Sequence, residues 1–263
     1  MPDIYFIVLD MYARQDVLQQ SYNFDNAPFV GDLRKLGFFV ADCSLSNYSH
    51  TELALASELN LDYIQTLVRG IPAEDTDHSR VWPLIKHSVV RTQLEAIGYQ
   101  TVAFETGYPW SQLEDAAVYL KPPTRSTILS QINPFEALLI NTTASLLLTD
   151  AQSVLFEKLY RDVNYLHVNR ELFTLRQLAE LPALEGPRFV FVHLLVPHRP
   201  FVFAADGSIQ DDPGYYSEGW GIPIDSEHDV KGYRDQVAFV NDRILSDIEA
   251  ILERSRVPPA ILL

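Results

Sequence analysis

Blocks of apolar residues alternate along the chain with longer amphipathic segments, and this pattern predicts strands separated by helices. Ile4–Leu9 is a short, solidly apolar run that ends in Asp10, which is typical of a buried parallel strand ending at a polar site. Further strand-like segments cover residues 38–41, 100–104, 188–195 and 257–263. The run 188–195 is the most strand-like after the first.

Apolar residues at helical spacing predict the intervening helices. In residues 27–36 the apolar positions include Phe29, Val30 and Leu33, and Gly37 follows as a stop signal. Other predicted helices are 51–61, 82–97, 134–148, 151–181 and 232–255, the second half of the chain being helix-rich. Residues 204–231 are rich in Gly, Pro, Asp and Tyr, which predicts a long loop.

This order of elements predicts the fold class. Strands that alternate with helices favour an α/β fold with a mostly parallel sheet flanked by helices. The chain has 263 residues, 47% of them hydrophobic, which suffices for one large core. We therefore expect a single domain over 1–263. Its last predicted strand reaches the end of the sequence, so we expect the sheet to be incomplete at the C-terminus.

Charge and cysteine content exclude some classes of function. The formal net charge of −15 argues against nucleic-acid binding, which needs clustered Lys and Arg. A phosphate- or sulfate-bearing ligand would need local positive charge, most simply a bound metal. The single cysteine, Cys43, permits neither an internal disulfide nor a multi-cysteine zinc site, and we expect it to be a small packed residue. No secretory signal and no apolar run of membrane-spanning length is evident.

Candidate chemistry lies where the predicted strands end. Ligands of open α/β sheets bind beyond the carboxyl ends of the strands. Asp10 follows the first strand, the polar segment 44–51 follows the second, and His198 follows the strand at 188–195. Asp10 is a candidate metal ligand; the alternative is a carboxylate that caps the following turn or helix.

Ser49-His50-Thr51-Glu52 matches a capping box, with Ser49 as N-cap and Glu52 three residues on. That assignment places Thr51 in the first turn of a helix, where unpaired N–H groups and the helix dipole favour anions. A hydroxyl in this place is suited to attack phosphorus or sulfur. The capping role alone explains the same pattern.

Two histidines near the strand at 188–195 are candidate substrate contacts. His193 lies within the strand, where a buried histidine with satisfied hydrogen bonds is the ordinary alternative. His198 lies beyond the strand between Pro197 and Pro200, where an exposed loop histidine is the alternative. Neutral imidazole suits a metal, and protonated imidazole suits an oxyanion.

Taken in order, several segments resemble the sulfatase-like hydrolases and transferases of the alkaline phosphatase superfamily. Residues 2–10 are similar to the opening strand and first metal-binding Asp of that family, and residues 23–40 to the helix and strand that follow. Residues 47–60 resemble the nucleophile segment of a bacterial branch that includes lipoteichoic acid synthases and phosphoethanolamine transferases, in which a Thr replaces formylglycine. Residues 191–201 resemble the His-Pro-rich segment of the substrate pocket, and 233–263 the helix and strand before the Asp-His-Gly metal motif.

The resemblance implies an alkaline phosphatase-like fold, a bound divalent cation (Mn, Mg, Ca or Zn) and a covalent intermediate on Thr51, with Ser49 as the second choice. It implies Asp10 and Thr51 as metal ligands and His193 and His198 as substrate-binding residues. The Asp-His-Gly motif is expected just beyond Leu263. Residues 43–47 depart from the formylglycine motif, because Leu45 and Asn47 stand where Pro or Ala and Arg are required.

The functional prediction is therefore metal-dependent hydrolysis or transfer of a phosphate or sulfate ester through Thr51. The substrate would be a small-molecule or lipid-linked ester. The parent protein is expected to be membrane-associated, with this domain on the extracytoplasmic side. The alternative is a non-catalytic α/β binding module or an inactive fragment of such an enzyme.

Overall fold

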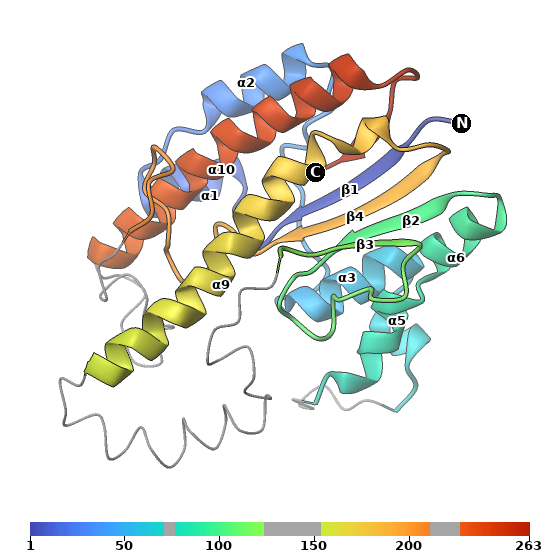
Figure 1. Cartoon of the computed structure of the whole chain (residues 1–263), viewed down its shortest axis with the longest axis horizontal. Coiled ribbons are helices and arrows are strands. Elements are labelled where there is room, and N and C mark those ends of the chain that lie inside the picture. Colours follow the sequence, from blue (N-terminus) through green and yellow to red (C-terminus); the bar gives the residue numbers. More distant parts are fainter. Residues whose placement is uncertain (71–76, 124–153, 211–226) are drawn as a thin grey trace.

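A five-stranded parallel sheet forms the centre of the molecule (Figure 1). The computed structural model describes residues 1–70, 77–123, 154–210 and 227–263, and only the backbone of 154–164. The strands lie in the order β3-β2-β4-β1-β5, and every pairing among them is parallel. Their bounds are β1 Ile4–Leu9, β2 Gln100–Phe104, β3 Val118–Leu120, β4 Arg188–Leu194 and β5 Ala260–Leu262. The predicted α/β class with a parallel sheet is confirmed.

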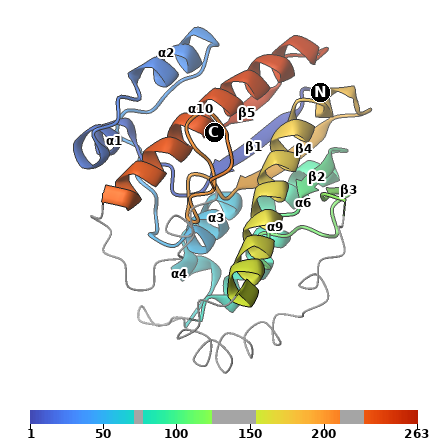
Figure 2. The same ribbon diagram turned by 60° about the vertical axis from the view of Figure 1, so that its left-hand side comes forward.

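Helices cover both faces of this sheet. One face carries α2, α9 and α10, and the other carries α3, α5 and α6; α2 runs alongside α10 in both views (Figure 1 and Figure 2). The helices are α1 Gln15–Tyr22, α2 Ala27–Lys35, α3 Thr51–Asn60, α4 Ile64–Leu67, α5 Trp82–Lys86, α6 Val89–Ala96, α9 Val154–Leu178 and α10 Glu227–Arg254, with 3₁₀ turns η1 Ser79–Val81 and η4 Leu181–Ala183. Among the described helices, none combines the length and apolar content that a bilayer crossing requires.

The strand pleat divides the apolar residues between two clusters. Tyr5 and Ile7 of β1 belong to the cluster under α2, α9 and α10, whereas Ile4, Phe6 and Val8 pack in the cluster under α3 and α5. Successive side chains of a strand point to opposite faces, so a strand buried on both faces is apolar throughout. This explains the continuous apolar run that opens the chain.

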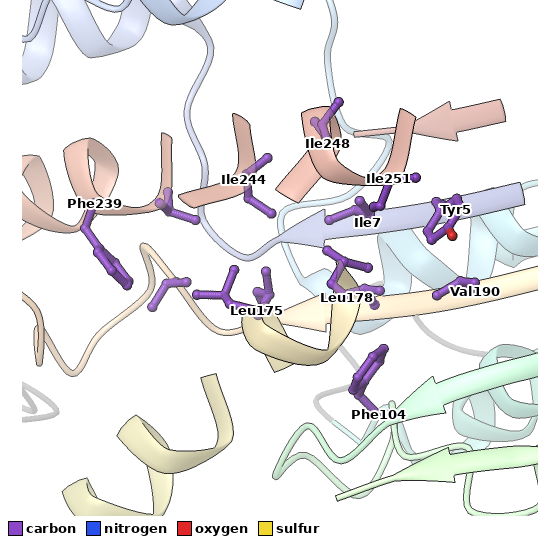
Figure 3. Close-up of a cluster of buried hydrophobic side chains, with 14 of the residues drawn as sticks. Tyr5, Ile7, Phe104, Leu175, Leu178, Val190, Phe239, Ile244, Ile248 and Ile251 are labelled. Carbon is purple, nitrogen blue, oxygen red and sulfur yellow. The ribbon is translucent and has the colours of Figure 1, made fainter. Parts of the chain in front are cut away.

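The larger cluster joins α9 and α10 to the sheet (Figure 3). Ile244, Ile248 and Ile251 of α10 are fully buried and follow one another at helical spacing. Leu175 and Leu178 of α9 are also fully buried beside them. This apolar face holds the two long helices against the strands whose carboxyl ends carry the candidate site.

The predicted strand at 38–41 is wrong, because this segment forms no ladder with the sheet. Both sides of β1 are already paired, with β4 and β5. Phe38 and Val40 pack by their side chains against the core, while Phe39 between them is 93% exposed. The alternating pattern thus reflects side-chain packing of an extended segment without backbone pairing.

Two predicted helices differ from the structure, and a third lies outside the described residues. The helix expected at 82–97 is two helices, because the Ser88 side chain accepts a hydrogen bond from Arg91 N and starts α6 anew. The last helix begins at Glu227, inside the predicted loop at 204–231, of which residues 211–226 lie outside the described part. The predicted helix at 134–148 lies wholly outside the described residues. The helices at 27–36 and 51–61 are confirmed within one residue at each end, and the strands at 100–104 and 188–195 are confirmed.

Candidate functional site

Asp10 lies at the carboxyl end of β1 and points to the α3 side of the sheet. It continues the alternation of Ile4, Phe6 and Val8, which face that side. Its backbone N–H donates to Leu194 O at 2.9 Å, which continues the pairing of β1 with β4. The Tyr233 hydroxyl of α10 fixes the next residues: it donates to Met11 O (2.8 Å) and accepts from Ala13 N (3.1 Å). Asp10 is therefore held rigidly, and it does not cap α1, whose N-cap is Arg14.

Thr51 is the first residue of α3 and meets Asp10 directly. Its Oγ1 donates a hydrogen bond to Asp10 Oδ1 at 2.8 Å. The predicted capping box is wrong, because the N-cap is His50 and no side chain caps the helix. Ser49 is exposed, and Glu52 bonds elsewhere. The first-turn N–H groups of α3 thus lie beside a strand-end carboxylate, with a hydroxyl between them.

His193 meets the other oxygen of the same carboxylate. It lies on β4 in register with Val8, and its side chain is fully buried. Its Nε2 is 3.6 Å from Asp10 Oδ2, and its Nδ1 is 3.1 Å from Ser111 Oγ. Nε2 itself has no hydrogen-bond partner among the described atoms. His193 is therefore a buried histidine in which only one of the two ring nitrogens has a hydrogen-bond partner among the described atoms.

Several opposing effects set the charge of Asp10. Burial raises the pKa of its carboxyl, but the His193 imidazole, the hydrogen bond from Thr51 and the charge of His198 together lower it below the ordinary value. Asp10 is thus an anion at neutral pH. A buried anion in this position attracts a cation or a proton donor.

His198 lies in the loop after β4, where the sequence places it. Its Nδ1 is 2.5 Å from Arg199 O, and Gln236 of α10 donates to its carbonyl at 2.9 Å. The ring is partly exposed and its charge acts on Asp10. The structure therefore brings Asp10, Thr51 and His193 into contact, with His198 within electrostatic range.

Two buried side chains of α9, Glu171 and His167, lie near the end of β4. Glu171 is 2% exposed and accepts a hydrogen bond from Leu195 N at 3.0 Å, one residue beyond β4. Burial raises the pKa of Glu171 to about 8, and the charge of Asp10 adds to that rise. His167 Nδ1 is 3.8 Å from Glu171 Oε1, and burial lowers the pKa of His167 to about 3. Both groups are thus neutral near pH 7, which limits the charge concentrated around Asp10.

The segment after β2 contributes side chains to the site that the sequence patterns did not predict. Ser111 is fully buried against His193, and the Trp110 ring lies 5.2 Å from the His193 ring. Tyr108 stacks on Trp110 at 5.3 Å. The signal was present, because this polar and aromatic segment follows a predicted strand, as Asp10 and His198 do. No such signal exists for Glu171, which lies in the middle of a helix.

Cys43 is exposed, so the expectation of a packed residue is wrong. The loop that carries it does not pair with the sheet, which leaves the thiol at the surface. Within the described residues, no group of three or more His, Cys, Asp and Glu side chains is arranged to hold a metal ion. Comparisons of the chain with protein-family models, with curated proteins and with solved structures find no match.

Proposed function

We propose that this site catalyses metal-dependent hydrolysis or transfer of a phosphate or sulfate ester through a covalent intermediate on Thr51. The observation that carries the proposal is the 2.8 Å hydrogen bond from Thr51 Oγ1 to the buried anion Asp10 at the tip of α3. In this proposal Thr51 is the nucleophile, Asp10 polarises its hydroxyl, and the positive N-terminal end of α3 favours the anionic ester. In the reaction, a bond forms from Thr51 Oγ1 to phosphorus or sulfur, and the bond to the ester oxygen breaks.

The donor set gives a partial fit to a divalent cation. Asp10 and Thr51 would supply two oxygens, and the unpartnered Nε2 of His193 faces the same carboxylate. A bound cation would act as a Lewis acid on the ester and on the hydroxyl.

The remaining side chains have distinct roles in this proposal. His193 lies 3.6 Å from Asp10 Oδ2 and favours the ionised carboxylate, and Ser111 orients its ring. His198, partly exposed, would contact the non-bridging ester oxygens. With a net charge of −15, the chain needs such local donors to attract an anionic substrate. The ester is a small-molecule or lipid-linked one.

Substitution of Thr51 tests the proposal, with Ser49 as the matched control. We expect Thr51→Ala to lower the hydrolysis of 4-nitrophenyl phosphate or 4-nitrophenyl sulfate at least about a thousandfold, because the nucleophile is lost. Ser49→Ala should change the rate less than about twofold, since Ser49 is exposed and is not the N-cap. Equal activity of Thr51→Ala and the parent chain would end the assignment.

A second candidate function is a non-catalytic α/β binding module. It is favoured by the ligand count, because in the described residues Asp10 and His193 are not joined by a third His, Cys, Asp or Glu to form a metal-binding group. Metal binding by the protein separates the two functions. A module would bind no divalent cation at this site and cleave neither ester.

A further inference from the structure

The side chain of Gln236, on α10, is fully buried and bonds at both ends to the loop that carries His198. Its Nε2 donates to His198 O at 2.9 Å, and its Oε1 accepts from Val202 N at 3.0 Å. Because an unpaired buried amide is costly, the side chain and the loop are ordered together. The two bonds therefore fix both ends of the segment 198–202 against α10.

A glycine one turn earlier in α10 admits the same loop closely. A Cβ atom at Gly232 would lie only 2.5 Å from Cδ2 and 2.9 Å from Cβ of Phe201, so the phenylalanine packs directly on the helix backbone. Glycine inside a helix costs roughly 1 kcal/mol relative to alanine, and here it permits this contact. Gly232 and Gln236 lie four residues apart, so one face of α10 is shaped to hold this loop.

The backbone of the loop determines how the His198 ring is oriented. Nδ1 of His198 is 2.5 Å from Arg199 O, and a carbonyl oxygen only accepts hydrogen bonds, so Nδ1 carries a proton. Nε2 is then the nitrogen left for a ligand, as an acceptor when the ring is neutral and as a donor when it is charged. Since the accepting carbonyl belongs to the loop itself, the ring turns with the backbone that Gln236 holds.

The same helix also fixes the segment that follows Asp10. The Tyr233 hydroxyl bonds to the backbone of residues 11–13, with distances of 2.8 and 3.1 Å. Tyr233 and Gln236 are three residues apart and so are neighbours on the helix surface. This part of α10 therefore sets where His198 lies relative to Asp10, on which its charge acts.

We propose that Gln236 is a positioning residue of this site, holding His198 so that Nε2 faces the non-bridging oxygens of the ester. The inference rests on the proposed function of Thr51. Gln236 touches neither the ester nor the reacting atoms and acts only through His198. Loss of its two hydrogen bonds should therefore weaken the action on the ester only in a protein that retains His198.

A double-mutant cycle tests this role, with 4-nitrophenyl phosphate as the substrate. Gln236→Met removes both hydrogen bonds and leaves a side chain of similar size. We expect it to lower kcat/KM about tenfold or more in the protein that retains His198, but less than about twofold in the His198→Ala background. A purely structural effect would lower kcat/KM by the same factor in both backgrounds.

Asn60 provides the matched control, because it is a buried amide with the same two-ended bonding at the far end of α3. Its Nδ2 donates to Leu84 O at 2.8 Å, and its Oδ1 accepts from Val89 N at 3.0 Å. Asn60→Leu should lower thermal stability as Gln236→Met does. At a temperature where both variants are folded, however, it should change kcat/KM less than about twofold, since the loop that it holds is not part of the site.

The nitrogen NMR signals of the His198 imidazole give a readout that does not depend on activity, and His198→Ala assigns them. At about pH 9, where neutral imidazole predominates, the parent protein should show the ring protonated on Nδ1. Gln236→Met should shift the signals toward the form protonated on Nε2, which free histidine prefers in water. Asn60→Leu should leave the signals unchanged.

Three results would overturn the inference. Equal losses from Gln236→Met with and without His198 would indicate an effect on the fold alone. Full activity of Gln236→Met, or an imidazole spectrum that this substitution leaves unchanged, would exclude the positioning role. If Thr51→Ala equals the parent protein in activity, the proposed function fails, and the role of Gln236 in ester binding fails with it. A normal loss in Thr51→Ala together with either of the first two results would count against Gln236 alone.

Discussion

At the scale of single residues, the site depends on how burial acts on neighbouring charges. Asp10 stays ionised because His193, Thr51 and His198 together outweigh the cost of its burial. Burial raises the pKa of Glu171, the charge of Asp10 raises it further, and the single hydrogen bond from Leu195 N does not offset these effects, so the neutral form of Glu171 is favoured. Asp10 is thus charged and Glu171 neutral near pH 7, because their neighbouring groups differ.

Replacement of Glu171 should change how stability depends on pH. The pKa of Glu171 rises from the ordinary 4.5 to about 8 in the folded protein. Between these values the folded state binds more protons at this position than the unfolded state, so its contribution to stability falls as pH rises. We expect the unfolding free energy of Glu171→Gln, relative to the parent, to rise from pH 5 to pH 8 by up to about 1.4 kcal/mol per unit, and to level off above pH 8. Urea denaturation over pH 5–9 measures this, and a constant difference would contradict it.

At the scale of elements, one buried ion pair lies at the amino ends of β1 and β4, opposite the candidate site at their carboxyl ends. Asp3, just before β1, accepts hydrogen bonds from Arg188 N (3.0 Å) and Nε (3.1 Å) at the start of β4. Arg188 also donates to the carbonyls of Leu181 and Leu184. This buried network aligns β1 with β4, the two strands whose other ends present Asp10 and His193.

Breaking this buried pair should destabilise the fold strongly. Asp3→Ala leaves the Arg188 guanidinium buried with its charge uncompensated, and we expect a loss of about 3–5 kcal/mol in unfolding free energy. The exposed pair of Arg14 and Asp16 is the matched control, and Asp16→Ala should change stability little. Chemical denaturation of both variants measures the difference. Equal effects at the two positions would show that burial does not decide the strength of the pair.

At the scale of the whole molecule, the parallel topology brings distant segments to one end of the sheet. Asp10 follows β1, Thr51 opens α3, and His193 lies on β4, so two residues that are far apart in the sequence, Thr51 and His193, contact the same carboxylate. Two apolar clusters, one on each face, hold these elements in place. β5 pairs with β1 on the side opposite β4, so β1 is central in the sheet.

The proposed metal site gives a prediction at this scale. We expect the protein to bind one divalent cation (Mn, Mg, Ca or Zn are the candidates), and Asp10→Asn to weaken that binding at least about tenfold through the loss of a charged ligand. Titration calorimetry of both forms, with thermal unfolding as a second readout, measures this affinity. Absence of binding would favour the non-catalytic module.

The sequence by itself determined the order of the main elements and the residues at the strand ends. Continuous apolar runs and helical spacing depend on local side-chain patterns, so β1, β2, β4 and α2 were predicted with close bounds. The strand-end rule selected Asp10, the segment 44–51 and His198, whereas the roles of Thr51 and His193 came from the family resemblance. Prediction from local patterns failed for residues 38–41 and for the capping box at Ser49, because a local pattern does not reveal whether a partner strand is available or which neighbour a side chain bonds.

Only the tertiary structure decided which of these groups meet. The pleat placed Asp10 and His193 on the α3 side, and packing brought Thr51 within hydrogen-bonding distance of Asp10. Packing likewise joined Glu52 to His78 and buried Glu171 behind the site. Such contacts join residues far apart in sequence, and their charge states follow from burial, so both properties arise only when the chain is folded.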